Sequence, residues 1–128
     1  MNTHQKSHVE GLGFSSARIF SPLELVDRIP RSDAAAKTVE ESRGIIQNIL
    51  NGTDDRLMII TGPCSIHDES AALDYANRLV KLRDSLSEKI YIVMRVYFEK
   101  PRTTVGWKGF INDPNLNETF DIPAGLER

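Results

Sequence analysis

Blocks of apolar and polar residues predict helices and strands in a definite order after residue 20. Ser21-Pro22-Leu23-Glu24 has the form of a capping box with proline at the first helical position, so a short helix is expected to run to about Arg28 and to end before Pro30. Ser32 or Asp33 can cap a second helix, for which Gly52 is a plausible stop. The expected apolar stripe of this second helix consists of Val39, Ile45, Ile46, Ile49 and Leu50.

Two short apolar runs predict strands. Residues 57–61 are continuous in apolar character and end at Gly62-Pro63, which is typical of a strand buried on both faces of a parallel sheet. Ile90 to Val96 predicts the second strand. Asp68 can cap a helix between them, whose apolar positions are Ala72, Tyr75, Ala76, Leu79, Val80 and Leu86. The order is β-α-β, so a right-handed crossover is expected to place both strand ends at one edge of the sheet.

Each predicted strand is followed by a polar loop that carries candidate chemistry. The first loop holds Cys64, the single cysteine, with His67 and Asp68 as the nearby metal-ligating side chains. A lone cysteine is most often a small buried apolar residue, and a metal ion usually needs three or more ligands. The sequence therefore allows a metal-binding sulfur here only if further ligands come from elsewhere.

The second loop collects the cations Arg95, Lys100, Arg102 and Lys108. One interpretation is a solvated charge run with Tyr97, Phe98 and Trp107 packed inward. The other is an anion site. Arg95 continues a strand predicted to be buried and is therefore expected to face a cleft, while Pro101 stiffens the backbone and Thr103 and Thr104 add hydroxyl donors. The expected ligand is small and anionic, since cations at fixed positions suit a phosphate or a carboxylate.

Composition narrows the function classes. The chain has 128 residues, of which 40% are hydrophobic and 27% charged, and its formal net charge of −2 argues against a nucleic-acid or membrane-surface protein. The single cysteine and the lack of an apolar leader or membrane-length segment make a cytoplasmic location the default. Residues 1–20 are expected to form a flexible arm, and Gly125 to Arg128 look like the opening turn of another helix. Two parallel strands cannot bury their own faces, which suggests the front portion of a larger α/β protein or a need for a partner chain.

With these residues in view, the chain resembles a known family. Gly62 to Asp68 and Met94 to Gly109 are similar to the signature blocks of class I 3-deoxy-D-arabino-heptulosonate 7-phosphate (DAHP) synthase, and the resemblance extends from about Ser21 to Arg128. It implies a metal-dependent transferase on a TIM (β/α)₈ barrel. The family condenses phosphoenolpyruvate with erythrose 4-phosphate and water, releasing phosphate, in the first step of the shikimate pathway to chorismate and aromatic amino acids.

The resemblance also implies roles for individual residues. Cys64 would be a ligand of a divalent metal ion, for which a thiolate is compatible with Mn, Fe, Co or Zn. Arg95 and Lys100 would be catalytic residues that contact phosphoenolpyruvate. The stretch Lys100-Pro101-Arg102-Thr103, chiefly Arg102 and Thr103, would hold erythrose 4-phosphate. The bound metal would act as a Lewis acid on the aldehyde oxygen.

The expected organisation is a flexible arm over residues 1–20, a helical extension over 21–52 and the start of a barrel domain over 53–128. The extension resembles the segment that the family uses for subunit contacts and feedback inhibition, which implies a homo-oligomer. A whole barrel takes about 250 residues, so the 128-residue chain is expected to be inactive and poorly folded by itself. The alternatives are a truncated, non-catalytic paralogue that docks on full-length synthase subunits, and a stand-alone binder of phosphorylated metabolites.

Overall fold

The computed structural model describes residues 7–8, 15–16, 18–100, 102 and 104–128. Its helices are α1 (Pro22–Arg28), α2 (Asp33–Leu50), α3 (Glu69–Leu86) and α4 (Ile122–Glu127). Its strands are β1 (Ser7–His8), β2 (Ser15–Ser16), β3 (Leu57–Thr61) and β4 (Ile90–Met94). β1 and β2 pair in antiparallel fashion, and the expected arm over residues 1–20 lies largely outside the described residues.

The helix starts confirm the capping signals of the sequence. The Ser21 hydroxyl accepts a hydrogen bond from the Glu24 backbone N–H at 3.2 Å, and the Glu24 carboxylate accepts one from the Ser21 N–H at 2.9 Å. Ser32 caps α2 and Asp68 caps α3 in the same way, through the N–H groups three residues ahead. Each cap satisfies N–H groups that have no partner within the helix. The final helix starts earlier than expected, because Asp121 caps it at Ile122.

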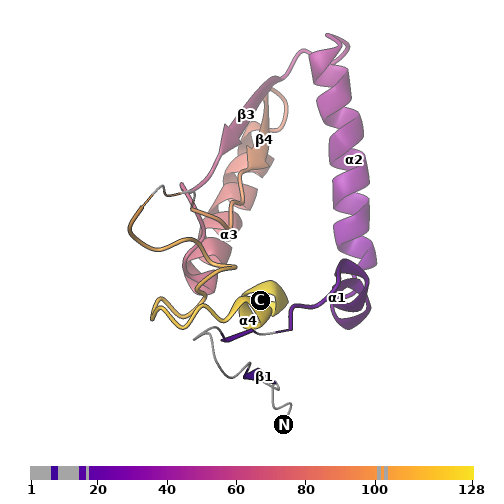
Figure 1. Ribbon diagram of the computed structural model, residues 1–128. Helices are drawn as coiled ribbons and strands as arrows, with labels where there is room; N and C mark the ends of the chain where they lie inside the picture. Colours follow the sequence, from indigo (N-terminus) through magenta and orange to yellow (C-terminus); the bar gives the residue numbers. More distant parts are fainter. Residues whose placement is uncertain (1–6, 9–14, 17, 101, 103) are drawn as a thin grey trace.

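β3 and β4 form a parallel pair of strands, and α3 connects them and packs against β4 (Figure 1). The register pairs Leu57 with Ile90 and continues to Thr61 opposite Met94. The predicted parallel β-α-β order is therefore confirmed. The second strand ends at Met94 and not at Val96, although the Arg95 N–H still donates to the Thr61 carbonyl at 2.7 Å. Beyond that bond the neighbouring chain turns at Gly62-Pro63, and proline has no N–H with which to continue the ladder.

Burial of these strands differs from the prediction. Leu57 is 63% exposed and Ile60 62% exposed, so the expectation that residues 57–61 are buried on both faces is wrong for this chain. The strand signal was correct because it depends on local apolar character, whereas burial depends on which elements cover the two faces. Among the residues described, Ile66 and Phe110 are the large apolar side chains classed as buried, and both lie in the loops beyond the strands.

The predicted helix stripes are partly covered. On α2, Ile45, Ile46 and Ile49 are half-buried, while Val39 and Leu50 are exposed. On α3, the first four predicted positions are half-buried, from Ala72 to Leu79, while Val80 and Leu86 are exposed. The covered part of α3 faces β4, and the hydroxyl groups of Thr61 and Tyr75 lie 3.2 Å apart across the packing.

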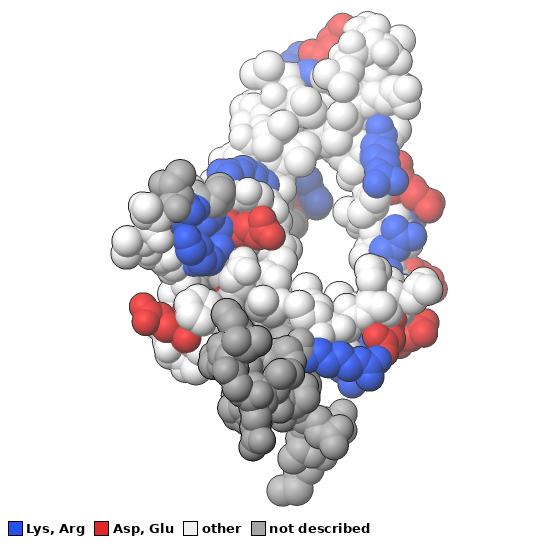
Figure 2. Space-filling model, viewed as in Figure 1, with Lys and Arg blue, Asp and Glu red and all other residues white. Residues whose placement is uncertain are grey.

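The helices are arranged as an open frame. α2 contacts β3 at one end and otherwise stands apart from the β-α-β unit, and the space-filling view keeps an open passage between them (Figures 1 and 2). α1 and α4 lie at the other end of the frame, where Arg28 forms an ion pair with Glu127. In the described part of the chain, none of the helices combines the length and the apolar character that a membrane crossing requires.

Candidate functional site

The loops that follow β3 and β4 are joined at the carboxyl edge of the strand pair. The Ile66 N–H donates to the Tyr97 carbonyl at 2.7 Å, and the Ile66 side chain is 4% exposed. Gly62 lies directly against the backbone of Arg95, because a Cβ atom at Gly62 would fall 2.3 Å from the Arg95 carbonyl oxygen. The sheet edge thus brings together two loops that are far apart in sequence, as parallel strands require.

Cys64 and Lys100 meet across this junction. The Cys64 thiol is exposed, and the Lys100 ammonium contacts its sulfur. The hydrogen bond from Lys100 and then its charge lower the pKa of the Cys64 thiol, and the more distant charges of Arg95 and Arg102 act in the same direction. Cations stabilise the thiolate over the thiol. The expected proximity of Cys64 to Lys100 is confirmed, and the electrostatics favour an anion at this position.

Arg95 lies beside the first loop in an exposed position. Its guanidinium donates to the Pro63 carbonyl at 3.4 Å and lies over the Tyr97 ring, with 5.2 Å between the guanidinium carbon and the ring centroid. The argument that Arg95 continues a buried strand is wrong, since the strand ends at Met94 and Arg95 is exposed. Its closeness to the residue before Cys64 nevertheless agrees with the expected grouping.

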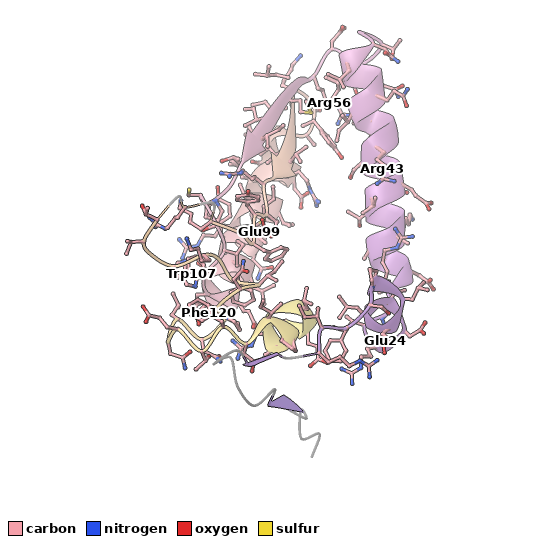
Figure 3. All side chains as sticks on the ribbon, viewed as in Figure 1. Glu24, Arg43, Arg56, Glu99, Trp107 and Phe120 are labelled. Carbon is pink, nitrogen blue, oxygen red and sulfur yellow. The ribbon has the colours of Figure 1, made fainter. Side chains whose placement is uncertain are left out.

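The remaining cations belong to a turn that folds back on the second loop. The Lys100 N–H donates to the Lys108 carbonyl at 2.9 Å, and the Lys108 ammonium donates to the Arg102 carbonyl at 3.1 Å. Figure 2 shows Lys and Arg side chains gathered over the loop that follows β4. Figure 3 places Glu99 and Trp107 on this side of the molecule, away from Glu24 on α1 and Arg43 on α2.

The solvated-run alternative is matched in part. Arg95 and Arg102 are exposed and Trp107 is half-buried, as that alternative expects, whereas the rings of Tyr97 and Phe98 are 37% and 42% exposed. The side chains of Arg95, Arg102 and Lys108 donate to backbone carbonyls, and that of Lys100 contacts the Cys64 sulfur. Pro101 and Thr103, both predicted to bind substrate, lie outside the described residues. Cys64, Arg95 and Lys100 come together at one edge of the strand pair, and the charge of Arg102 also acts on the Cys64 thiol.

A metal ion needs more donors than this part of the chain supplies. No group of three or more His, Cys, Asp or Glu side chains that could hold a metal occurs among the described residues. Asp68, one of the two nearby candidates, caps α3 with its carboxylate, which accepts from the Ala71 N–H at 2.7 Å and the Ser70 hydroxyl at 2.6 Å. The donor set described here does not by itself fit a metal ion, because Cys64 supplies a single ligand.

Asp113 is a supporting residue that the sequence analysis missed. Its side chain is 2% exposed and accepts backbone N–H bonds from Asn117 at 3.3 Å and Glu118 at 3.2 Å. The Trp107 indole donates to the Asp113 carbonyl at 2.8 Å. Gly106, Gly109, Asn112 and Pro114 are residue types typical of turns, but residue type alone does not indicate which side chains close those turns.

Comparisons with known proteins identify the family. The profile of the DAHP synthetase I family matches residues 32–127. A phospho-2-dehydro-3-deoxyheptonate aldolase of Corynebacterium glutamicum is 58% identical over 106 residues, which cover 83% of this chain and 29% of that protein. The Phe-sensitive aldolase of Escherichia coli K12 is 54% identical over 108 residues, covering 84% of this chain and 31% of that protein. The chain therefore belongs to the DAHP synthetase I family.

A solved structure supports the same assignment. The phospho-2-dehydro-3-deoxyheptonate aldolase of Francisella tularensis superposes with a TM-score of 0.76 at 50% identity, over 80% of this chain and 30% of that one. The chain thus spans about 30% of the length of these relatives. The α/β architecture with a parallel strand pair is that of the matching region.

Proposed function

We propose that this sequence contributes part of the active site of a DAHP synthase, which condenses phosphoenolpyruvate with erythrose 4-phosphate and water and releases phosphate. The observation that carries the proposal is the convergence of Cys64, Arg95 and Lys100 at one sheet edge in a chain of this family. Both substrates are anions. Fixed cations offset their repulsion and hold the reacting carbons together, which is how such a site would accelerate the condensation.

The proposed roles follow from position. Arg95 and Lys100 would bind phosphoenolpyruvate, since both side chains come from the loop after β4 and contact neighbouring residues, Pro63 and Cys64, of the first loop. Arg102, with Pro101 and Thr103, would hold the phosphate of erythrose 4-phosphate. A guanidinium presents several N–H donors in a plane and suits a phosphate group better than a flexible ammonium does.

A divalent metal ion, Mn, Fe, Co or Zn, is proposed as the cofactor, with Cys64 as one of its ligands. The support is chemical, because the lowered pKa of the thiol favours the thiolate form in which cysteine binds metals. The other ligands would have to come from residues besides those described. When bound, the ion would supply Lewis-acid polarisation of the aldehyde oxygen.

We further propose a homo-oligomer in the cytoplasm, with subunit contacts through residues 21–52. The support is an apolar surface on α1 and next to it, where Leu23 is 79% exposed, Val26 62% and Ile29 49%. Neighbouring exposed apolar side chains are typical of an interaction surface. The alternative of a non-catalytic docking paralogue is not favoured, since the similar proteins are named as aldolases.

The proposal is tested on the complete protein, by which we mean a synthase of the relatives' length that contains this sequence. The assay measures consumption of phosphoenolpyruvate that depends on erythrose 4-phosphate. Lys100→Met is expected to lower kcat/KM by about ten- to a hundredfold, since a charged hydrogen bond is worth roughly 1.5–3 kcal/mol. Lys81→Met, at an exposed lysine of α3, is the matched control and should leave the rate unchanged. Equal rates for the two variants would refute the assignment of Lys100.

A further inference from the structure

We propose that Gly106 and Trp107 are positioning residues that fix the guanidinium of Arg102 for phosphate binding. The inference rests on the proposed function, which makes Arg102 a ligand of erythrose 4-phosphate. It concerns residues that the family resemblance and the comparisons leave without a role. A hydrogen bond from the Arg102 side chain, a steric contact with it and the anchoring of the turn that holds it support the inference.

The first contact is a hydrogen bond to the turn. The Arg102 Nε donates to the Trp107 carbonyl at 3.1 Å. A guanidinium has five N–H donors, so this bond restrains the orientation of the group and leaves the two terminal nitrogens for a ligand. Two donors held in one plane match a phosphate group in bidentate fashion.

The second contact is steric. A Cβ atom at Gly106 would lie 3.0 Å from Arg102 Cδ and 3.1 Å from Arg102 Nε. Gly106 also has a φ of +110°, a conformation that suits glycine. A Cβ atom at Gly106 would therefore press against the Arg102 side chain and shift it by a few tenths of an ångström from its present position.

The third contact anchors the turn itself. The Trp107 indole donates to the carbonyl of Asp113, whose buried carboxylate closes the next turn through the N–H groups of Asn117 and Glu118. The Lys108 ammonium adds a bond to the Arg102 carbonyl. The position of Arg102, an exposed residue, is therefore tied to a buried part of the loop. Such preorganisation removes the entropy cost of ordering the arginine on binding.

The test is steady-state kinetics of the complete protein with both substrates varied. Gly106→Ala is expected to raise the KM for erythrose 4-phosphate about tenfold, the scale of one weakened charge-assisted hydrogen bond, while the KM for phosphoenolpyruvate changes less than about twofold. Gly52→Ala is the matched control. Gly52 also has a positive φ, of +72°, and a Cβ there would meet nothing within 4 Å, so it controls for alanine at a positive-φ glycine that does not touch Arg102.

A double-mutant cycle separates the two proposals. In an Arg102→Ala background, Gly106→Ala should raise the KM for erythrose 4-phosphate no further than about twofold. If Arg102→Ala leaves that KM unchanged, the proposed phosphate site fails and the positioning inference fails with it. Two results would overturn the positioning inference alone, provided that Arg102→Ala does raise the KM for erythrose 4-phosphate. In one, Gly106→Ala changes that KM no more than Gly52→Ala does. In the other, Gly106→Ala raises that KM by the same factor with Arg102 present and with Arg102 replaced by alanine. Should Gly106→Ala not fold, Trp107→Phe, which removes the indole bond to Asp113, is put through the same cycle with the same expected outcome.

Discussion

The ammonium of Lys100 contacts the thiol of Cys64 although 36 positions separate them in the sequence. The contact exists because β3 and β4 are parallel and in register, so the chain leaves both strands at the same edge. Gly62 permits the two loops to touch, since its missing side chain lets the Arg95 carbonyl approach. The Cys64 sulfur of one loop and the Lys100 ammonium of the other therefore lie together at this edge of the strand pair.

The first prediction concerns the ionisation of Cys64. Because the hydrogen bond and charge of Lys100 lower the pKa of the thiol, Lys100→Met should raise that pKa toward its ordinary value. The thiolate fraction at a given pH would then fall, and the pH–rate curve for alkylation by iodoacetamide should move to higher pH. The rate is measured in buffer with a chelator, so that no metal competes for the sulfur.

Lys81→Met controls for the loss of one positive charge elsewhere on the surface. Lys81 lies on α3, and its replacement should leave the curve unchanged. A curve for Lys100→Met that overlies the unsubstituted protein would show that the Cys64–Lys100 contact does not control the thiol.

The second prediction uses two glycines of opposite character. Gly62→Ala should destabilise the complete protein by about 1–3 kcal/mol, since the new Cβ would overlap the Arg95 carbonyl and backbone cannot move aside cheaply. Gly44→Ala should stabilise it by up to about 1 kcal/mol, because Gly44 lies inside α2 with open space around it and alanine favours the helix. Urea unfolding of both variants measures the change in the free energy of unfolding. If Gly62→Ala stabilised the protein as Gly44→Ala is expected to, the packing described at Gly62 would be contradicted.

The sequence contained enough information for the elements and their order because those signals are local. Ser21, Ser32 and Asp68 each cap a helix through N–H groups three residues away, and a capping side chain is visible without any tertiary contact. A predicted helix between two apolar runs was enough to predict that the two strands are parallel. Parallel strands end at the same edge, so this prediction also placed Cys64 near Lys100.

What the sequence could not predict depends on partners distant in the chain. The second strand ends at Met94 because the facing segment turns at Pro63, and the exposure of Leu57 reflects which elements cover it. Arg95 was predicted to be cleft-facing on the false premise of a buried strand end. The hydrogen bonds that join Arg102 to Trp107 and Trp107 to Asp113 depend on the geometry of the loop. Glycine and asparagine in the sequence indicate only that a turn exists there.

The third prediction concerns the buried carboxylate. Asp113→Ala should destabilise the complete protein by about 1–3 kcal/mol, because the N–H groups of Asn117 and Glu118 lose their acceptor. Asp55→Ala, at an exposed aspartate before β3, should change stability by less than about 0.5 kcal/mol. Chemical unfolding of the two variants makes the comparison, and a loss at Asp113 no larger than at Asp55 would contradict the closing role of this carboxylate.

The fourth prediction is that the 128-residue polypeptide, expressed alone, neither turns over substrate nor unfolds cooperatively. Its large apolar side chains are mostly uncovered, as at Leu57, Ile60 and Leu73, which are each more than 60% exposed, so little apolar area is available to offset the entropy of ordering the chain. We expect a broad calorimetric transition and strong binding of the dye ANS, which reports exposed apolar surface. Lys81→Met should behave identically, because a surface charge does not limit folding here. A sharp transition without dye binding, or measurable turnover, would show that residues 1–128 suffice for a packed core.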